Sequence, residues 1–209
     1  MMEAERTEHL NQEQQRDYTG SKMGMWLFLY TEFLLFGGLF LLYSVYRTRY
    51  VEQFHTAAAT LDTVLGAVNT VVLITSSLTM AVSVSAIRKG DRKLSVSALF
   101  LTILFGCGFL VIKFFEWKAK IAHGLFPGAL EMFELPQGEV IFYSLYYVIT
   151  GMHGLHVLVG VVVLLGMLTL LMRKKINEKD FIKLENTGLY WHLVDIVWIY
   201  LFPFFYLLT

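Results

Sequence analysis

Five segments of this 209-residue chain are each long and apolar enough to cross a lipid bilayer, which takes about 20 residues of helix. Lipid offers the backbone no hydrogen-bond partners, so only helices and closed barrels can span it. None of the segments alternates polar and apolar residues as a barrel strand does. The sequence therefore predicts an all-α polytopic membrane protein, a bundle of five transmembrane helices over about residues 23–46, 64–87, 94–117, 140–172 and 186–208.

The composition agrees with a bilayer protein and excludes several other classes. Hydrophobic residues make up 56% of the chain and charged residues 16%, against about 45–50% and about 25% in soluble domains. The 17 basic residues balance the 17 acidic ones, so the basic excess of a nucleic-acid binder is missing and no nucleic-acid partner is expected. The single cysteine, Cys107, excludes an internal disulfide and a Cys-ligated metal site.

Lysine and arginine are distributed unevenly between the two sides of the predicted bundle. About 12 lie in the N-terminal tail and the second and fourth loops, and about five lie on the opposite side. The positive-inside rule then places the N-terminus in the cytoplasm and the C-terminus outside. We expect residues 1–22 to be a polar cytoplasmic tail and residues 23–209 to be the five-helix transmembrane domain.

Five polar residues inside the spans are the candidate site. Glu32 and Asp195 lie within the first and last spans, where an acid costs about 2.5–3.5 kcal/mol at mid-membrane. Each is therefore expected to be protonated or to have a partner. His192 lies three residues from Asp195 and shares its helix face. His153 and His156 have the same spacing in the fourth span.

Four interpretations of this intramembrane polar network stay open: hydrogen bonds between helices, a site for lipid headgroups or a neighbouring subunit, a proton relay, and metal or haem ligation. A haem held by two histidines would need His153 and His192. A carboxylate-bridged metal site needs Glu-x-x-His pairs from several helices, and the nearest approach is His192-x-x-Asp195. No metal site and no catalytic residue are therefore expected in this chain.

Other residues indicate packing. Small residues let membrane helices approach closely, so Gly151 and Gly154 are expected to serve subunit packing together with the aromatic residues Trp191 and Trp198. Glu116 lies beside Lys113 and Lys118 at the end of the third span. This spacing predicts a paired charge at the membrane interface.

Four segments carry a resemblance to subunit III of the haem–copper oxidases, the cytochrome c and quinol oxidase family. Residues 150–157 read Thr-Gly-Met-His-Gly-Leu-His-Val, and residues 190–198 read Tyr-Trp-His-Leu-Val-Asp-Ile-Val-Trp. Residues 31–40 resemble the family's buried-glutamate helix, and Asn-Thr at 69–70 with Gly-Asp-Arg-Lys at 90–93 resembles its next helix and turn. The resemblance covers residues 21–208 and is to the five-span bacterial form, which lacks two helices of the mitochondrial type.

The resemblance implies a non-catalytic subunit of a respiratory terminal oxidase in the bacterial cytoplasmic (inner) membrane. Subunit III of this family carries no haem or copper; those cofactors belong to partner subunits. The implied partners are subunit I by direct contact, subunit II, a small subunit IV, and bound phospholipid. In the family, lipid lies in a cleft beside the two helices missing here, so another subunit would have to supply that wall.

Two other functions are consistent with the same residues. One is an accessory protein of a nitric oxide reductase with the same fold. The other is a small proton-coupled transporter, which the intramembrane acids Glu32 and Asp195 suggest. Co-purification with a haem-bearing subunit would count against the transporter.

Overall fold

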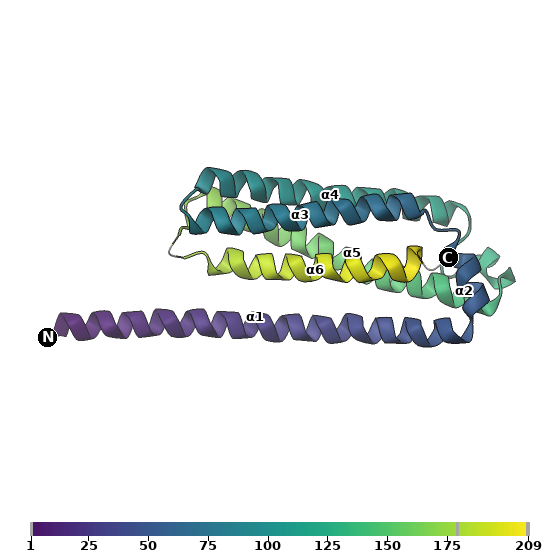
Figure 1. Cartoon of the computed structure of the whole chain (residues 1–209), viewed down its shortest axis with the longest axis horizontal. Coiled ribbons are helices and arrows are strands. Elements are labelled where there is room, and N and C mark those ends of the chain that lie inside the picture. The colour runs from purple at the N-terminus through teal and green to yellow at the C-terminus, as the bar shows by residue number, and fades with distance from the viewer. Residues whose placement is uncertain (1, 179, 208–209) are drawn as a thin grey trace.

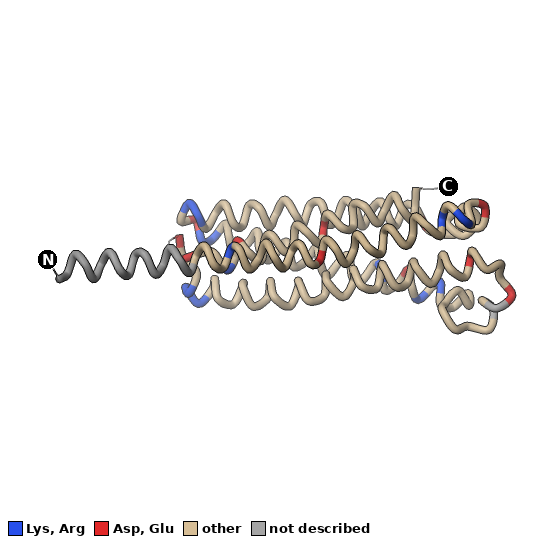
Figure 2. Tube along the Cα trace, turned by 90° about the horizontal axis from the view of Figure 1, so that it is seen from below, with Lys and Arg blue, Asp and Glu red and all other residues tan. Residues whose placement is uncertain are grey.

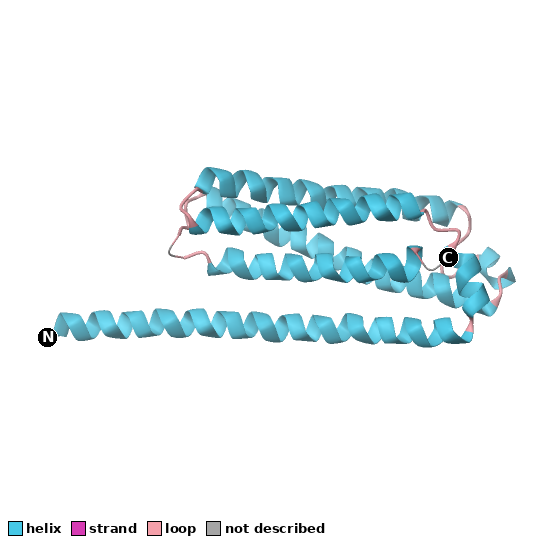
Figure 3. Ribbon diagram, in the orientation of Figure 1, coloured by secondary structure: helices cyan, strands magenta, loops and turns pink. Residues whose placement is uncertain are grey.

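The computed structural model describes residues 2–178 and 180–207, and over these residues it contains helices and loops but no strand (Figure 3). Five helices are long and apolar enough to cross a membrane, which confirms the predicted all-α fold. The helical elements in chain order are α1 (Met2–Arg49), α2 (Val51–Ala58), α3 (Thr63–Arg88), α4 (Arg92–Ala122), the 3-10 helix η1 (Leu130–Glu134), α5 (Gln137–Met172) and α6 (Ile182–Tyr206).

Helices α3 to α6 form a four-helix bundle, and α1 lies along its side against α5 and α6 (Figure 1). The first span and the polar segment before it belong to one continuous helix. Charged residues gather at the two ends of the bundle, and few interrupt the length between them (Figure 2). We call the end at Arg49 and Tyr206 the distal end and the opposite end the proximal end.

Residues between the spans cap the beginnings of the helices and form the turns that join them. Asp62 and Asp91 are the N-caps of α3 and α4, and each side chain accepts a hydrogen bond, at 3.0 Å, from the backbone N–H three residues later. Gly90, in the turn between these helices, has a φ of +80°, which glycine adopts without steric cost. The resulting hairpin packs tightly, with Ser83 Oγ donating to the Ser95 carbonyl at 2.9 Å.

Glycines make room in the bundle for large aromatic side chains. A Cβ at Gly106 or Gly160 would come within 2.7–2.8 Å of the Trp191 ring, so Trp191 fills the space that these two glycines leave on α4 and α5. Trp198 is also fully buried, and its Nε1 donates to Thr70 at 3.0 Å. Both tryptophans therefore pack inside the chain itself, where another subunit cannot reach them.

The other two residues expected to serve packing lie at a surface groove. Gly151 faces the Trp117 ring, which a Cβ would approach to 3.2 Å, whereas no atom lies within 4 Å of a Cβ at Gly154. Both line a groove of about 420 Å³ between α4 and α5. This face is open to lipid or to a neighbouring helix.

Candidate functional site

Glu32 and His156 form a hydrogen-bonded pair that joins α1 to the bundle. Glu32 Oε2 lies 2.9 Å from His156 Nε2, and His156 Nδ1 lies 2.8 Å from the Met152 carbonyl. The Tyr190 hydroxyl donates to the His156 carbonyl at 2.9 Å and so ties α6 to the same point. The Glu32 carboxyl group therefore has a partner inside the membrane-spanning region, as the cost of burial requires.

His192 and Asp195 share a helix face as predicted, but they do not bond to each other. His192 Nδ1 lies 2.6 Å from the Ser77 hydroxyl of α3. Asp195 is buried at 2% exposure, and neither of its carboxyl oxygens has a hydrogen-bond partner among the described residues. The Ser77 hydroxyl, which contacts His192, also lies close enough to Asp195 to act on its carboxyl group. The partner of His192 thus comes from a neighbouring helix.

His153 lies at the centre of the bundle among aromatic rings. Its imidazole stacks on Trp198 with ring centroids 5.4 Å apart and meets the edge of Phe109 at 5.5 Å. The side chain is fully buried, and neither ring nitrogen has a hydrogen-bond partner among the described residues. Asn69 of α3 is equally buried and equally without a partner there. The predicted network is therefore three separate features: the Glu32–His156 pair, the Ser77–His192 pair beside Asp195, and buried His153.

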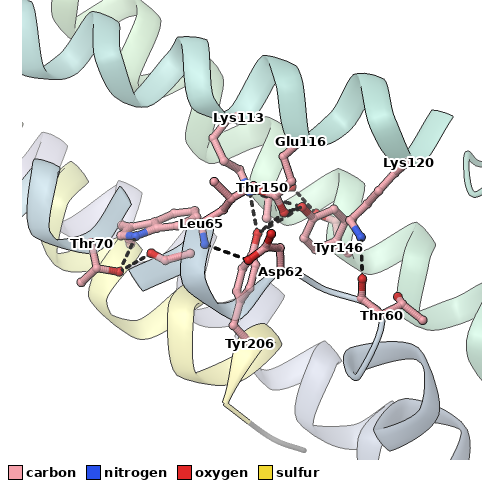
Figure 4. A network of polar contacts seen from close by, with 12 residues as sticks. Thr60, Asp62, Leu65, Thr70, Lys113, Glu116, Lys120, Tyr146, Thr150 and Tyr206 are labelled. Carbon is pink, nitrogen blue, oxygen red and sulfur yellow. Dashed lines mark hydrogen bonds and ion pairs between the residues drawn. The ribbon is translucent and has the colours of Figure 1, made fainter. Parts of the chain in front are cut away.

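A fourth polar cluster, which we call the distal network, joins α4, α5 and α6 (Figure 4). It consists of Lys113, Glu116, Tyr146 and Tyr206. Glu116 Oε1 accepts from the hydroxyls of Tyr146 and Tyr206 at 2.7 and 2.6 Å, and Oε2 accepts from Lys113 Nζ at 3.1 Å. Lys113 also donates to Tyr206 at 2.7 Å.

The ion pair predicted between Glu116 and Lys113 exists. Its side chains are only 9% and 3% exposed, so the pair is enclosed between helices at the distal end of the bundle. Lys118, the other expected partner, is exposed. The sequence hint was the spacing of three between Lys113 and Glu116, which puts both on one helix face. The two tyrosines are 30 and 90 residues away from Glu116, so spacing alone could not have found them.

Among residues 2–178 and 180–207, no group of three or more His, Cys, Asp or Glu side chains is placed to hold a metal ion. The two histidines that a haem would need lie in different surroundings: Trp198 and Phe109 pack on the His153 ring, and His192 Nδ1 contacts the Ser77 hydroxyl of α3. These contacts can hold the helices together. They leave the polar atoms of Asp195 and His153 available to other groups within the membrane-spanning region.

Comparison with known proteins agrees with this picture. The family described as "Cytochrome c oxidase subunit III" matches residues 3–209. Quinol oxidase subunit 3 of Bacillus spizizenii is 31% identical over 98% of this chain and 97% of its own length, and cytochrome c oxidase subunit 3 of Thermostichus vulcanus is 31% identical over 90% and 87%. Heme-copper oxidase subunit I+III of Aeropyrum pernix is 30% identical over 89% of this chain, which spans 22% of that protein. This chain therefore belongs to the cytochrome c oxidase subunit III family.

Proposed function

We propose that this chain supports subunit I of a respiratory haem–copper oxidase without taking part in the chemistry: it stabilises the complex, binds lipid and sustains proton uptake. The complex reduces oxygen to water and pumps protons. Haem and copper are proposed to belong to the partner subunits, which the pairing of Glu32 with His156 and the aromatic packing around His153 support.

The observation that carries the proposal is the one-sided packing of α1. Its Glu32 turns toward His156, while Trp26, Leu27 and Phe33 are 62%, 67% and 64% exposed. Within the most apolar part of this span only 11% of the residues are buried, against 28–44% in the other four spans. Helix α1 is thus held to its own bundle by few contacts, and the rest of its surface is apolar. Such a surface suits a chain that packs against lipid and a larger membrane partner.

Subunit I is the proposed direct partner, with subunit II and a small subunit IV as further members of the complex. The Aeropyrum pernix relative carries subunits I and III in one name and one chain, which supports contact between the two. Relatives from Bacillus and Thermostichus support a place in the cytoplasmic membrane of a bacterium. Their names also favour an oxidase over the accessory protein of a nitric oxide reductase.

The test is purification of the complex through an affinity tag on this chain, with the tagged chain produced alone as the control. The tagged complex is expected to carry haem and to consume oxygen, and the chain alone is expected to show no Soret band. A Soret band in the isolated chain would overturn the non-catalytic role. Recovery of the tagged chain without any haem-bearing subunit would favour the transporter instead.

A further inference from the structure

A cavity of about 400 Å³ lies at the distal end, between the last turns of α4 and the loop that joins α2 to α3. Leu65 and Phe115 are among its apolar walls, and Asp62, Glu116, Lys120 and His123 bring polar groups to it. It is separate from Glu32, His153, His156, His192 and Asp195, none of which lines it. Its position at the end of two spans is the level at which lipid headgroups lie.

Lys120 is the residue that makes this cavity a candidate binding site. It is only 8% exposed, and its Nζ donates one hydrogen bond, to the Thr60 carbonyl at 3.3 Å (Figure 4). An ammonium group carries three N–H donors, so two of them have no acceptor among the described residues. A buried ammonium group without enough acceptors is costly, and an anionic oxygen in the cavity would supply them.

The carboxyl groups of Glu116 and Asp62, both beside Lys120, differ in whether an oxygen remains free to bind a ligand. Both lie close enough to act on its charge. Glu116 already accepts hydrogen bonds on both oxygens from Lys113, Tyr146 and Tyr206. Asp62 uses Oδ1 to cap α3 at Leu65 and is otherwise open to the cavity. The cavity therefore offers one cation and one anion, a combination that suits a ligand carrying both signs of charge.

An apolar depression on the surface of α3 begins near the cavity. A second hollow, of about 450 Å³, follows α3 and is lined by Thr63, Val64, Ala67, Val68, Val71 and Val72. It begins within a turn of Leu65, a wall of the polar cavity. Val64 and Val71 are 71% and 63% exposed. A headgroup in the first hollow would thus place its acyl chain along the second.

We propose that this cavity binds the headgroup of a zwitterionic phospholipid with a primary ammonium, the chemistry of phosphatidylethanolamine. The phosphate accepts hydrogen bonds from Lys120, the ammonium group lies against Asp62, and an acyl chain follows α3. This inference rests on the lipid-binding part of the proposed function and assigns it a place. The recognition is that of basic pockets for phosphate headgroups at membrane helices, with the carboxylate of Asp62 selecting against lipids whose headgroup is anionic only.

The test measures lipid retained by the whole complex, purified in mild detergent and delipidated, then exposed to mixed micelles of phosphatidylethanolamine, phosphatidylglycerol or phosphatidylcholine. Native mass spectrometry counts bound lipid. Lys120→Met is expected to weaken phosphatidylethanolamine binding at least tenfold, whereas the exposed Lys118→Met should bind it as the unaltered complex does. Asp62→Asn keeps a good N-cap residue and should lose the preference for phosphatidylethanolamine over phosphatidylglycerol.

One further variant and one competition measurement complete the test. Ala119→Phe fills the cavity from its wall without removing a charge, and it should lower lipid binding as Lys120→Met does, in case the lysine variant assembles poorly. Inorganic phosphate at millimolar concentration should not displace the lipid; displacement would indicate a site for a free anion and overturn the proposal. Equal lipid binding by the Lys120→Met, Ala119→Phe and Lys118→Met complexes would overturn it too.

The haem content and oxygen consumption of the same variants separate this inference from the proposed function. If the Lys120→Met complex keeps its haem and retains lipid unchanged, only the cavity assignment is wrong. If complexes with and without this chain behave alike in assembly and turnover, the supporting role itself is wrong.

Discussion

The distal network differs from two mid-membrane residues, Asp195 and His153, in how its buried polar groups are satisfied. Both oxygens of Glu116 accept hydrogen bonds from side chains on three helices. Asp195 and His153 are equally buried, yet their polar atoms have no partner among the described residues. Because an unbonded polar group in a membrane interior is costly, the distal network can stabilise the fold by itself, and the mid-membrane groups need partners such as buried water.

Removing one member of the Lys113–Glu116 ion pair should cause the largest loss of stability. Glu116→Leu leaves the Lys113 ammonium group buried without its carboxylate, and we expect a loss of about 3–5 kcal/mol in stability. The double variant Lys113→Leu/Glu116→Leu should recover much of this loss, because no charge is left unpaired. Thermal unfolding of the detergent-solubilised chain measures both. Equal destabilisation by the single and double variants would show that charge pairing is not what the network provides.

Overpacking next to Trp191 gives the next largest effect. Gly106→Ala would put a Cβ 2.7 Å from the indole ring, and we expect a loss of about 1–3 kcal/mol. Gly108→Ala is the matched control two residues away, where no atom lies within 4 Å. The same unfolding assay compares them, and similar stability of the two variants would contradict the close fit of Trp191 between α4 and α5.

Glu32→Gln tests the hydrogen-bonded pair that joins α1 to α5. Hydrogen bonds between membrane helices contribute about 0.6 kcal/mol on average, so the stability loss should be of that size. In the oxidase, we expect the initial rate of oxygen consumption to persist and the rate during sustained turnover to decay faster. Glu52→Gln, at an exposed acid of α2, is the control. An immediate fall in the initial rate would point to a direct proton path through Glu32.

Asp195→Asn should have the smallest effect on stability. No hydrogen bond to its carboxyl group is made within the described residues, so the near-isosteric amide removes none, and the change should stay below about 1 kcal/mol. Haem content per subunit I should also be unchanged. A loss comparable to that of Glu116→Leu would mean that Asp195 has an unseen partner as strong as the distal network.

The spans could be predicted from sequence because membrane helices satisfy their own backbones, so length and apolar character suffice. The polar pairs that join different helices could not, because their members are far apart in the sequence. Glu32 and His156 were both identified, but they are 124 residues apart, and only the packing of α1 against α5 joins them. The tyrosines that enclose Glu116 could not be predicted either, because they come from α5 and the end of α6, 30 and 90 residues away.

The supporting role is tested most directly by oxygen consumption of the purified oxidase with and without this chain. We predict equal initial rates and equal haem content, followed by faster loss of activity during turnover in the complex that lacks the chain. An initial rate that collapses together with the haem signal, in an otherwise intact remainder of the complex, would contradict it.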